Sequence, residues 1–154
     1  MTEEAIGQSA SAREVDPWEF SEEWRVRQYE LDSQGHVNNA VYLNYAEQVA
    51  IDHAEAAGFG RDFNERHGGG WVVRQHEIVY HRPAVYGDAL RVTTRVESLG
   101  GARATRRTLI RRRQSSELLA EAVTQWTWVR HSDGRPARIP AELVSLYTAA
   151  HPTI

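Results

Sequence analysis

The stretch that decides the fold of this chain reads YELDSQGHVNNAVYLNY and spans residues 29–45. Its first part brings a carboxylate, Asp32, into a turn that contains glycine, and Asn38 and Asn39 follow where a long helical pattern begins. The first backbone N–H groups of a helix lack partners within the helix and stabilise negative charge. A carboxylate beside them places a base or nucleophile next to donors for a developing oxyanion, an arrangement that suits acyl transfer.

The helical pattern that follows predicts one long helix over residues 39–57. Gly58 and Gly60 stand where the C-terminus of a helix takes glycine. The many alanines allow close packing on more than one side, which a curved sheet around the helix would provide. The apolar face has the spacing of an amphipathic helix and consists of Tyr42, Ala46, Val49, His53 and Ala57.

Strands are predicted on both sides of this helix in the sequence. Alternating apolar residues ahead of it indicate a strand over residues 24–31. After a glycine-rich turn, β-branched and aromatic alternation predicts four more strands, over residues 71–80, 89–98, 103–113 and 118–129. A short terminal helix is expected over residues 140–149. One strand, one long helix and four consecutive antiparallel strands make an α+β order, in which the sheet must cover the helix.

Length and composition limit the classes of function. The 154 residues suffice for one domain, and we expect a mobile tail over residues 1–16 followed by one folded domain over residues 17–154. A net charge of −3 provides no field that would attract nucleic acid or an acidic membrane surface. All 18 basic residues are arginine and cysteine is absent, which removes lysine Schiff bases, thiolate metal sites and disulfides.

Neither a targeting segment nor a cofactor motif is recognisable. The N-terminal residues are acidic where a signal peptide needs basic ones, and no apolar run approaches the roughly 20 residues that span a bilayer. The histidines show no metal-ligand spacing, and no phosphate-binding loop is present. We therefore expect a cytoplasmic protein that uses no cofactor and no metal, and that binds neither membrane nor nucleic acid.

Two motifs resemble those of hotdog-fold acyl-thioesterases. The run Asp32-Ser-Gln-Gly-His-Val-Asn-Asn-Ala-Val-Tyr42, with Glu47 further along the helix, is similar to the 4-hydroxybenzoyl-CoA thioesterase-like branch of that family. Its His-Val-Asn-Asn is similar to the acyl-ACP thioesterases. The run Tyr80-His-Arg-Pro-Ala-Val-Tyr-Gly-Asp88 resembles the second characteristic turn of the family. The resemblance extends over residues 24–130.

The resemblance implies a single hotdog domain, in which an antiparallel sheet wraps around one central helix and pairs with a second subunit. A homodimer or a dimer of dimers is therefore expected. The resemblance also implies that Asp32 is the catalytic carboxylate and that a backbone N–H near Asn39 polarises the thioester carbonyl. His36 is either catalytic or holds the loop of Asp32 in place. We expect four further residues to contact the substrate, namely Gly35, Asn38, Tyr42 and Arg82.

The expected function is hydrolysis of an acyl-CoA or acyl carrier protein thioester to the free acid and the thiol. A thioester lacks amide resonance, so a carboxylate, a water and N–H donors suffice, with Asp32 as general base or as nucleophile. Gln34 stands where the plant acyl-ACP enzymes carry asparagine. The simpler scheme, in which Asp32 is the leading catalytic group, therefore applies to this chain more directly than the plant catalytic network does. Glu47 is either a solvated helix residue or a second catalytic group. Two alternatives stay open, a hotdog hydratase or dehydratase and a non-catalytic acyl-CoA-binding protein.

Six arginines are concentrated on the predicted hairpin over residues 103–113. As a rim beside the groove they would contact the phosphates of coenzyme A or an acidic carrier protein. As a solvated edge strand they would prevent aggregation by charge. The six are Arg103, Arg106, Arg107, Arg111, Arg112 and Arg113. Trp126 and Trp128 share one strand face and are expected in the core or in a dimer contact.

Overall fold

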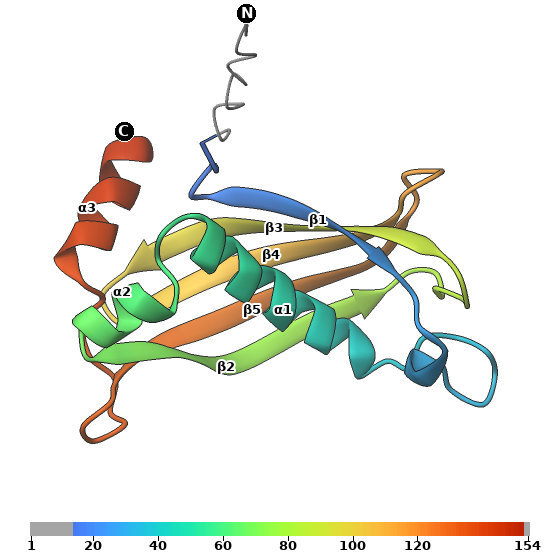
Figure 1. The fold of residues 1–154 in the computed structure, drawn as a ribbon, viewed down its shortest axis with the longest axis horizontal. Coiled ribbons are helices and arrows are strands. Elements are labelled where there is room, and N and C mark those ends of the chain that lie inside the picture. Colours follow the sequence, from blue (N-terminus) through green and yellow to red (C-terminus); the bar gives the residue numbers. More distant parts are fainter. Residues whose placement is uncertain (1–13, 153–154) are drawn as a thin grey trace, which may run out of the picture.

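The computed structural model describes residues 14–152, and one five-stranded antiparallel sheet wraps around helix α1 (Val41–Ala56) (Figure 1). Of the predicted tail over residues 1–16, positions 1–13 lie outside the described residues. In chain order the strands are β1 (Glu19–Arg25), β2 (Gly69–Tyr80), β3 (Ala89–Gly100), β4 (Arg103–Arg112) and β5 (Leu118–Arg130). The predicted α+β architecture with one central helix is confirmed.

The order of strands across the sheet is β1-β3-β4-β5-β2. Strands β3, β4 and β5 follow one another through tight turns, so they pair with their neighbours in the sequence. Strands β1 and β2 precede and follow α1 in the chain, and they form the two edges of the sheet. The chain therefore enters α1 from one edge of the sheet and leaves it toward the other edge.

Helix α1 begins and ends close to the predicted positions. Its buried residues repeat every three or four positions, as expected of a helix with one face on a sheet: Tyr42, Tyr45, Ala46, Val49, Ala50 and His53. Gly58 adopts φ +87°, a conformation that glycine tolerates best. The N–H of Gly58 donates to the carbonyl of Glu55, and the N–H of Phe59 donates to that of Ala54. This pair of bonds is the Schellman ending.

The core has two parts, one along α1 and one beyond its C-terminal end. The first contains Tyr42, Tyr45 and Val49 of α1, packed against buried residues of the sheet such as Leu90 and Val92. The second joins α2 (Arg61–Arg66) and α3 (Ala141–Ala150) to β5, through Phe63, Trp128, Ile139 and Leu143. Trp126 and Trp128 are both buried, in agreement with the expected place in the core.

Two elements differ from the prediction. The first strand covers Glu19–Arg25 instead of residues 24–31, and a short 3-10 helix, η1 (Gln28–Glu30), follows it. The carboxylate of Glu30 accepts the N–H of Arg27 at 2.7 Å, and this local bond turns the chain away from an extended path. Helix α2 was not predicted, because six residues are too few to show a helical period.

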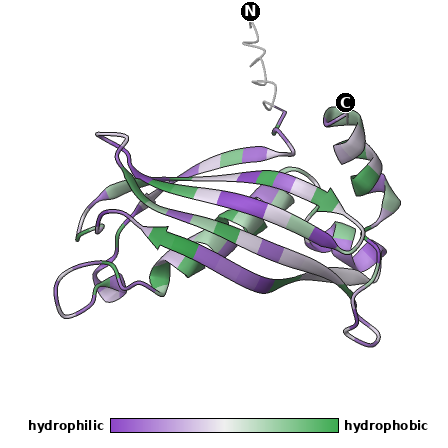
Figure 2. Cartoon of the chain, turned by 180° about the vertical axis from the view of Figure 1, so that it is seen from behind, coloured by the Kyte–Doolittle hydropathy of each residue, from purple (hydrophilic) through white to green (hydrophobic). Residues whose placement is uncertain are grey.

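The interpretation of the arginine-rich hairpin as an edge strand is wrong, because β4 lies in the middle of the sheet. Arg107 pairs with Glu97 and Glu121 on the two neighbouring strands. Arg112 pairs with Asp88 and Glu117, and Arg113 pairs with Glu23. Figure 2 shows hydrophilic stretches crossing neighbouring strands on the face away from α1. None of the helices between residues 14 and 152 is long and apolar enough to cross a membrane.

Candidate active site

The turn that carries Asp32 is fixed by its own main chain. One carboxylate oxygen, Oδ1, accepts the N–H groups of Gln34 at 2.8 Å and of His36 at 3.1 Å. The N–H of Asp32 donates to the carbonyl of His36 at 2.7 Å, which closes the turn. Gly35 lies inside it with φ +76°, where a side chain would be strained. Asp32 is exposed, and Oδ2 has no partner within residues 14–152, so this oxygen is available for chemistry.

The two predicted asparagines lie directly ahead of α1. The side-chain oxygen of Asn38 accepts the N–H of Ala40 at 2.9 Å, which forms an Asx-turn directly ahead of the helix. The carbonyl of Asn38 accepts the N–H of Val41. The N–H of Asn39 has no acceptor in the described part of the chain. That N–H is therefore a free donor at the positive end of α1, close in sequence to the Asp32 turn.

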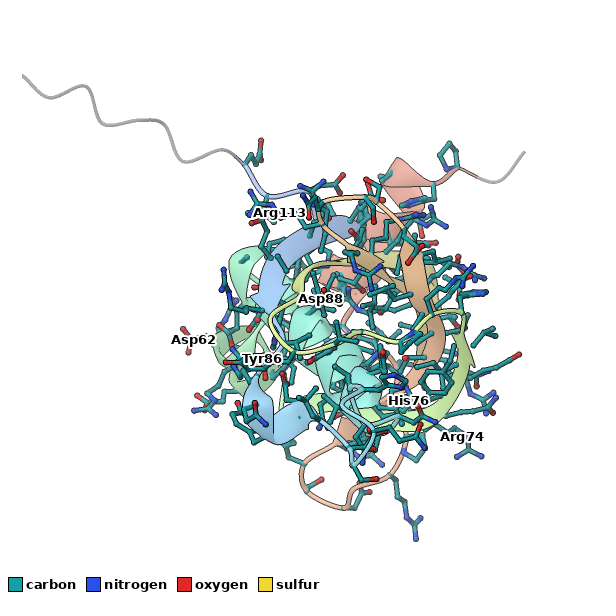
Figure 3. The ribbon with its side chains drawn as sticks, turned by 90° about the vertical axis from the view of Figure 1, so that its right-hand side faces the viewer. Asp62, Arg74, His76, Tyr86, Asp88 and Arg113 are labelled. Atoms are coloured by element: carbon teal, nitrogen blue, oxygen red, sulfur yellow. The ribbon has the colours of Figure 1, made fainter. Side chains whose placement is uncertain are left out.

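The second predicted motif packs directly on the first. His36 and Val85 form an isolated β-bridge, and the N–H of Val37 donates to the carbonyl of Ala84 at 2.9 Å. In Figure 3, a view from the right-hand side of Figure 1, the loop that carries Tyr86 and Asp88 crosses in front of α1. The structure thus brings both motifs together at the N-terminal end of the helix.

Two tyrosines connect the helix and the residues ahead of it to the segment that contains the second motif. The hydroxyl of Tyr42 accepts the N–H of Ala84 at 3.0 Å, and the hydroxyl of Tyr80 donates to the carbonyl of Asn39 at 2.7 Å. Burial raises the pKa of both hydroxyls, so both stay protonated at neutral pH. Tyr42, which the sequence suggested as a substrate contact, is only 2% exposed, and its observed contacts are with the core and the loop.

Arg112 fastens the second loop to the end of β4. Its guanidinium pairs with Asp88 at 3.3 Å and donates to the carbonyl of Pro83. The carboxylate of Asp88 in turn accepts the N–H of Val85 at 3.0 Å. The hydrogen bond with Asp88 raises the pKa of Arg112, so the guanidinium of Arg112 stays charged. Arg112 therefore supports the site through the loop that packs on His36.

The other predicted residues also lie near the N-terminal end of α1. The half-buried His36 contributes its main-chain N–H to Asp32, while its imidazole makes no hydrogen bond within the described residues. Arg82 is exposed on the second loop, and its side chain pairs with no group between residues 14 and 152. Asp32, Gly35, His36, Asn38 and Asn39 thus share one connection, with Arg82 on the loop that packs against it.

One contact at the site was not predicted from the sequence. Nε2 of His76, on β2, lies 3.3 Å from the carboxylate of Glu47 on α1, and its Nδ1 lies 2.8 Å from the hydroxyl of Thr124. Thr124 is buried, whereas the Glu47 carboxylate remains half-exposed. The strand alternation that places His76 opposite the helix is the only sequence signal for this pair.

The arrangement can perform carboxylate chemistry on a polarised carbonyl. It combines an accessible carboxylate oxygen on Asp32 with a free N–H at the start of a helix. Among residues 14–152, no three histidine, aspartate or glutamate side chains group in a way that could hold a metal ion.

Comparison with known proteins places this geometry in a family. A family profile described as the thioesterase-like superfamily matches residues 26–146. The chloroplastic acyl-acyl carrier protein thioesterase ATL3 of Arabidopsis thaliana is 32% identical over 130 residues, which cover 84% of this chain and 68% of that protein. The long-chain acyl-CoA thioesterase FadM of Escherichia coli is 29% identical over 119 residues, which cover 77% of this chain and 89% of that protein.

Other relatives are longer, and solved structures share the fold. The chain spans only 32% of a chloroplastic palmitoyl-acyl carrier protein thioesterase from Gossypium hirsutum. The DHNA-CoA thioesterase of Staphylococcus aureus superposes with a TM-score of 0.78 at 20% identity, over 86% of this chain and 90% of that one. At such identity the likeness is one of fold alone. The predicted resemblance to hotdog-fold thioesterases and the predicted fold are both confirmed.

Proposed function

This chain belongs to the thioesterase-like superfamily, and on that premise we propose that it hydrolyses an acyl thioester to the free acid and the thiol. The observation that carries the proposal is the Asp32 carboxylate. One of its oxygens is fixed by two backbone N–H groups and the other is open, beside the start of α1. A carboxylate oriented in this way needs no further side chain to reach a productive geometry.

Asp32 acts on the thioester carbonyl either directly or through a water molecule. In both routes the acyl carbon gains an oxygen, the C–S bond breaks and the sulfur leaves as a thiol after taking a proton. The oxygen comes from water when Asp32 is the base. When Asp32 attacks directly, water cleaves the resulting acyl–Asp32 anhydride in a second step and releases the free acid. The N–H of Asn39 donates to the carbonyl oxygen as its negative charge develops. His36 shapes the turn through its main chain, and Gly35 and Asn38 leave the approach to Asp32 open for the substrate.

The substrate carries its acyl group on coenzyme A or on an acyl carrier protein. The names of two relatives support this range, since ATL3 acts on acyl-acyl carrier protein and FadM on long-chain acyl-CoA. Arg82 is exposed on the loop beside Asp32, and a guanidinium there suits the phosphates that both carriers bear.

The enzyme works as a homodimer or a dimer of dimers. Strand β2 forms one edge of the sheet, and it carries exposed apolar side chains, with Val72 46%, Val79 51% and Tyr80 41% accessible. An edge strand with apolar side chains is a surface that a second copy can cover. Because Tyr80 also contacts Asn39, a partner on this edge would lie next to the reaction site.

The proposal is tested by following thiol release from acyl-CoA and acyl carrier protein thioesters with short, long, branched and aromatic acyl groups. We expect turnover of at least one class, with the active species eluting as a dimer or larger in size-exclusion chromatography with light scattering. Binding without thiol release from any thioester would instead support a non-catalytic acyl-thioester-binding protein. Water addition to an enoyl thioester would support the hydratase alternative.

A further inference from the structure

A cavity of about 440 Å³ lies at the C-terminal end of α1, opposite to the Asp32 turn. Its wall includes the last turns of α1 and residues of α2, β3, β4 and β5. Figure 1 shows how these elements are arranged. A volume of this size falls within the roughly 300–1,000 Å³ of small-molecule sites. Val41 and His53 are separated by roughly 18 Å along the helix axis, so the cavity is distinct from the turn of Asp32.

A charged side chain faces this cavity from the middle of the sheet. Along β4 the buried residues alternate, and Arg106 falls on the same inward face as Ala104 and Thr108. The next residue, Arg107, belongs to the opposite face and is neutralised by two carboxylates. The two adjacent arginines are both half-buried, but Arg107 pairs with carboxylates on the outer face whereas Arg106 faces the cavity.

Only one of the three guanidinium nitrogens of Arg106 has hydrogen-bond partners within the described residues. Nη1 donates to Nδ1 of His53 at 2.9 Å and to the hydroxyl of Thr94 at 3.2 Å. Nε2 of His53 donates to the carbonyl of Asp16 at 2.7 Å, which leaves Nδ1 as the acceptor and the ring neutral. No acceptor for Nε or Nη2, and no ion pair for Arg106, occurs among residues 14–152.

The charge states follow from burial. Burial lowers the pKa of Arg106 to about 10, so its guanidinium remains charged at neutral pH. Burial also lowers the pKa of His53, and the neighbouring guanidinium acts in the same direction. The structure therefore keeps a positive charge in a half-buried position, where its hydrogen-bond partners are neutral groups.

Other polar atoms around the cavity also lack partners. Nε1 of Trp126 and Oδ1 of Asn64 are buried and form no hydrogen bond within the described chain. Glu55 and Glu65 line the cavity as well, but both are exposed and neither pairs with Arg106. Within the described chain the guanidinium of Arg106 is half-buried, has two unpaired nitrogens and has no counter-ion, so it suits an anionic ligand that supplies the missing acceptors.

We propose that this cavity binds an organic anion with a carboxylate on an apolar or aromatic body. The carboxylate lies on Nε and Nη2 of Arg106, the two nitrogens that bind carboxylates in a bidentate manner. The apolar body lies against the aromatic wall formed by Trp18, Phe59 and Trp71, and the indole N–H of Trp126 supplies one more donor.

Two sources can supply such a carboxylate. One is the free acid that thioester hydrolysis releases, and the other is the distal carboxylate of an acyl group that carries one at each end. Both sources rest on the proposed function, whereas the binding site itself does not. Binding is therefore measured separately from hydrolysis.

The binding test is calorimetric titration with phenylbutyrate and with its neutral counterpart, phenylbutyramide. We expect the wild-type protein to bind the carboxylate at least about tenfold more tightly, as charge-assisted hydrogen bonds predict. Arg106→Met should abolish this preference, and Arg107→Met, the matched control on the outer face, should retain it. Arg106→Gln, which keeps a donor for His53, serves the same comparison if circular dichroism shows that Arg106→Met does not fold.

Hydrolysis of adipoyl-CoA and hexanoyl-CoA distinguishes the two sources. If the site takes a distal carboxylate, Arg106→Met raises KM for adipoyl-CoA alone. If it takes the released acid, both thioesters respond alike while the preference for phenylbutyrate is still lost. Equal affinity of the wild-type protein for phenylbutyrate and phenylbutyramide would overturn the proposal, as would equal losses in the two methionine variants. Failure to hydrolyse either thioester would count against the proposed function and leave the titration to decide the cavity.

Discussion

The two ends of α1 hold their charged groups in different ways. At the N-terminal end, Asp32 is exposed and its carboxylate is supported by backbone N–H groups of its own turn. At the C-terminal end, Arg106 is half-buried beside a cavity and is supported by the side chains of His53 and Thr94. Backbone support fixes a group while leaving it open to water, which suits a reaction. Side-chain support beside an apolar cavity suits recognition of one kind of ligand.

The strongest test of this comparison is Asp32→Asn. The amide keeps an oxygen for the N–H groups of Gln34 and His36 but can act neither as base nor as nucleophile. We therefore expect kcat for thioester hydrolysis to fall at least about a hundredfold, with phenylbutyrate binding unchanged. Asp133→Asn is the matched control. Like Asp32, Asp133 lies in an exposed turn and accepts the backbone N–H of the residue two positions later, which is Arg135. Near-normal turnover in Asp32→Asn would remove this carboxylate from the mechanism.

A smaller effect is expected from Tyr42→Phe, which removes the acceptor for the N–H of Ala84. Tyr42 is 2% exposed and Ala84 is 0% exposed, so the donor is left buried without a partner. The free energy of unfolding in urea should fall by about 1–3 kcal/mol. Tyr29→Phe, at a position that is 82% exposed, should change it by less than about 0.5 kcal/mol. Equal stability of the two variants would mean that this bond does not hold the second loop.

His36→Ala is expected to cost less activity than Asp32→Asn. The main-chain N–H of His36 supports Asp32 and survives the substitution, so we expect kcat to fall by about tenfold or less. The exposed His81 provides the control, His81→Ala, which should retain full activity. A loss in His36→Ala as large as that in Asp32→Asn would favour a catalytic imidazole, as in the network of the acyl-ACP thioesterases.

The smallest effect concerns the pH dependence of stability at the C-terminal end of α1. Burial lowers the pKa of His53 in the folded state below its usual 6.5, so the unfolded chain binds more protons there as pH falls. The stability that neutral His53 provides is present above pH 6.5 and is lost as pH falls toward its folded pKa, by at most about 1.4 kcal/mol per unit. Urea unfolding at several pH values should show this dependence in the wild type and less of it in His53→Gln.

The control for the pH experiment is His81→Gln, which should keep the wild-type dependence. Glu22 acts in the opposite direction, because burial and the neighbouring Asp52 raise its pKa to about 7. The folded state therefore binds the extra proton at Glu22, and lowering the pH stabilises it through that group. Only the difference between wild type and His53→Gln isolates the histidine, and an identical slope in both would exclude it.

The sequence revealed those features that depend on neighbouring residues. Alternation and turn glycines predicted β2 to β5 within about three residues of their observed ends, and the spacing of Tyr42, Val49 and His53 predicted α1. The Asp32 turn could be identified because its hydrogen bonds join residues at most four positions apart. The family and fold that these local patterns suggested are confirmed.

The features that sequence reasoning missed depend on which surfaces meet in space. The contact of His76 with Glu47 joins a strand to the helix, and strand alternation alone does not identify Glu47 as the partner of His76. Arg106 and Arg107 look alike in the sequence, and only the covered face of β4 separates their environments. The edge interpretation failed for the same reason, since the position of a strand within a sheet is set by distant pairing.

The order of strands in the sheet also has a consequence for how the chain folds. Strands β3, β4 and β5 close through short loops, whereas Glu19 pairs with Arg95 and Gly69 pairs with Arg130. Closing long loops costs entropy that is recovered only when the pairing forms, so we expect the central meander to assemble early and both edges to dock late. The cavity wall combines Trp18, α1 and β4, and the Asp32 turn packs on the loop after β2. The Asp32 turn and the cavity, at the two ends of the helix, would therefore be completed in the last and slowest step of folding.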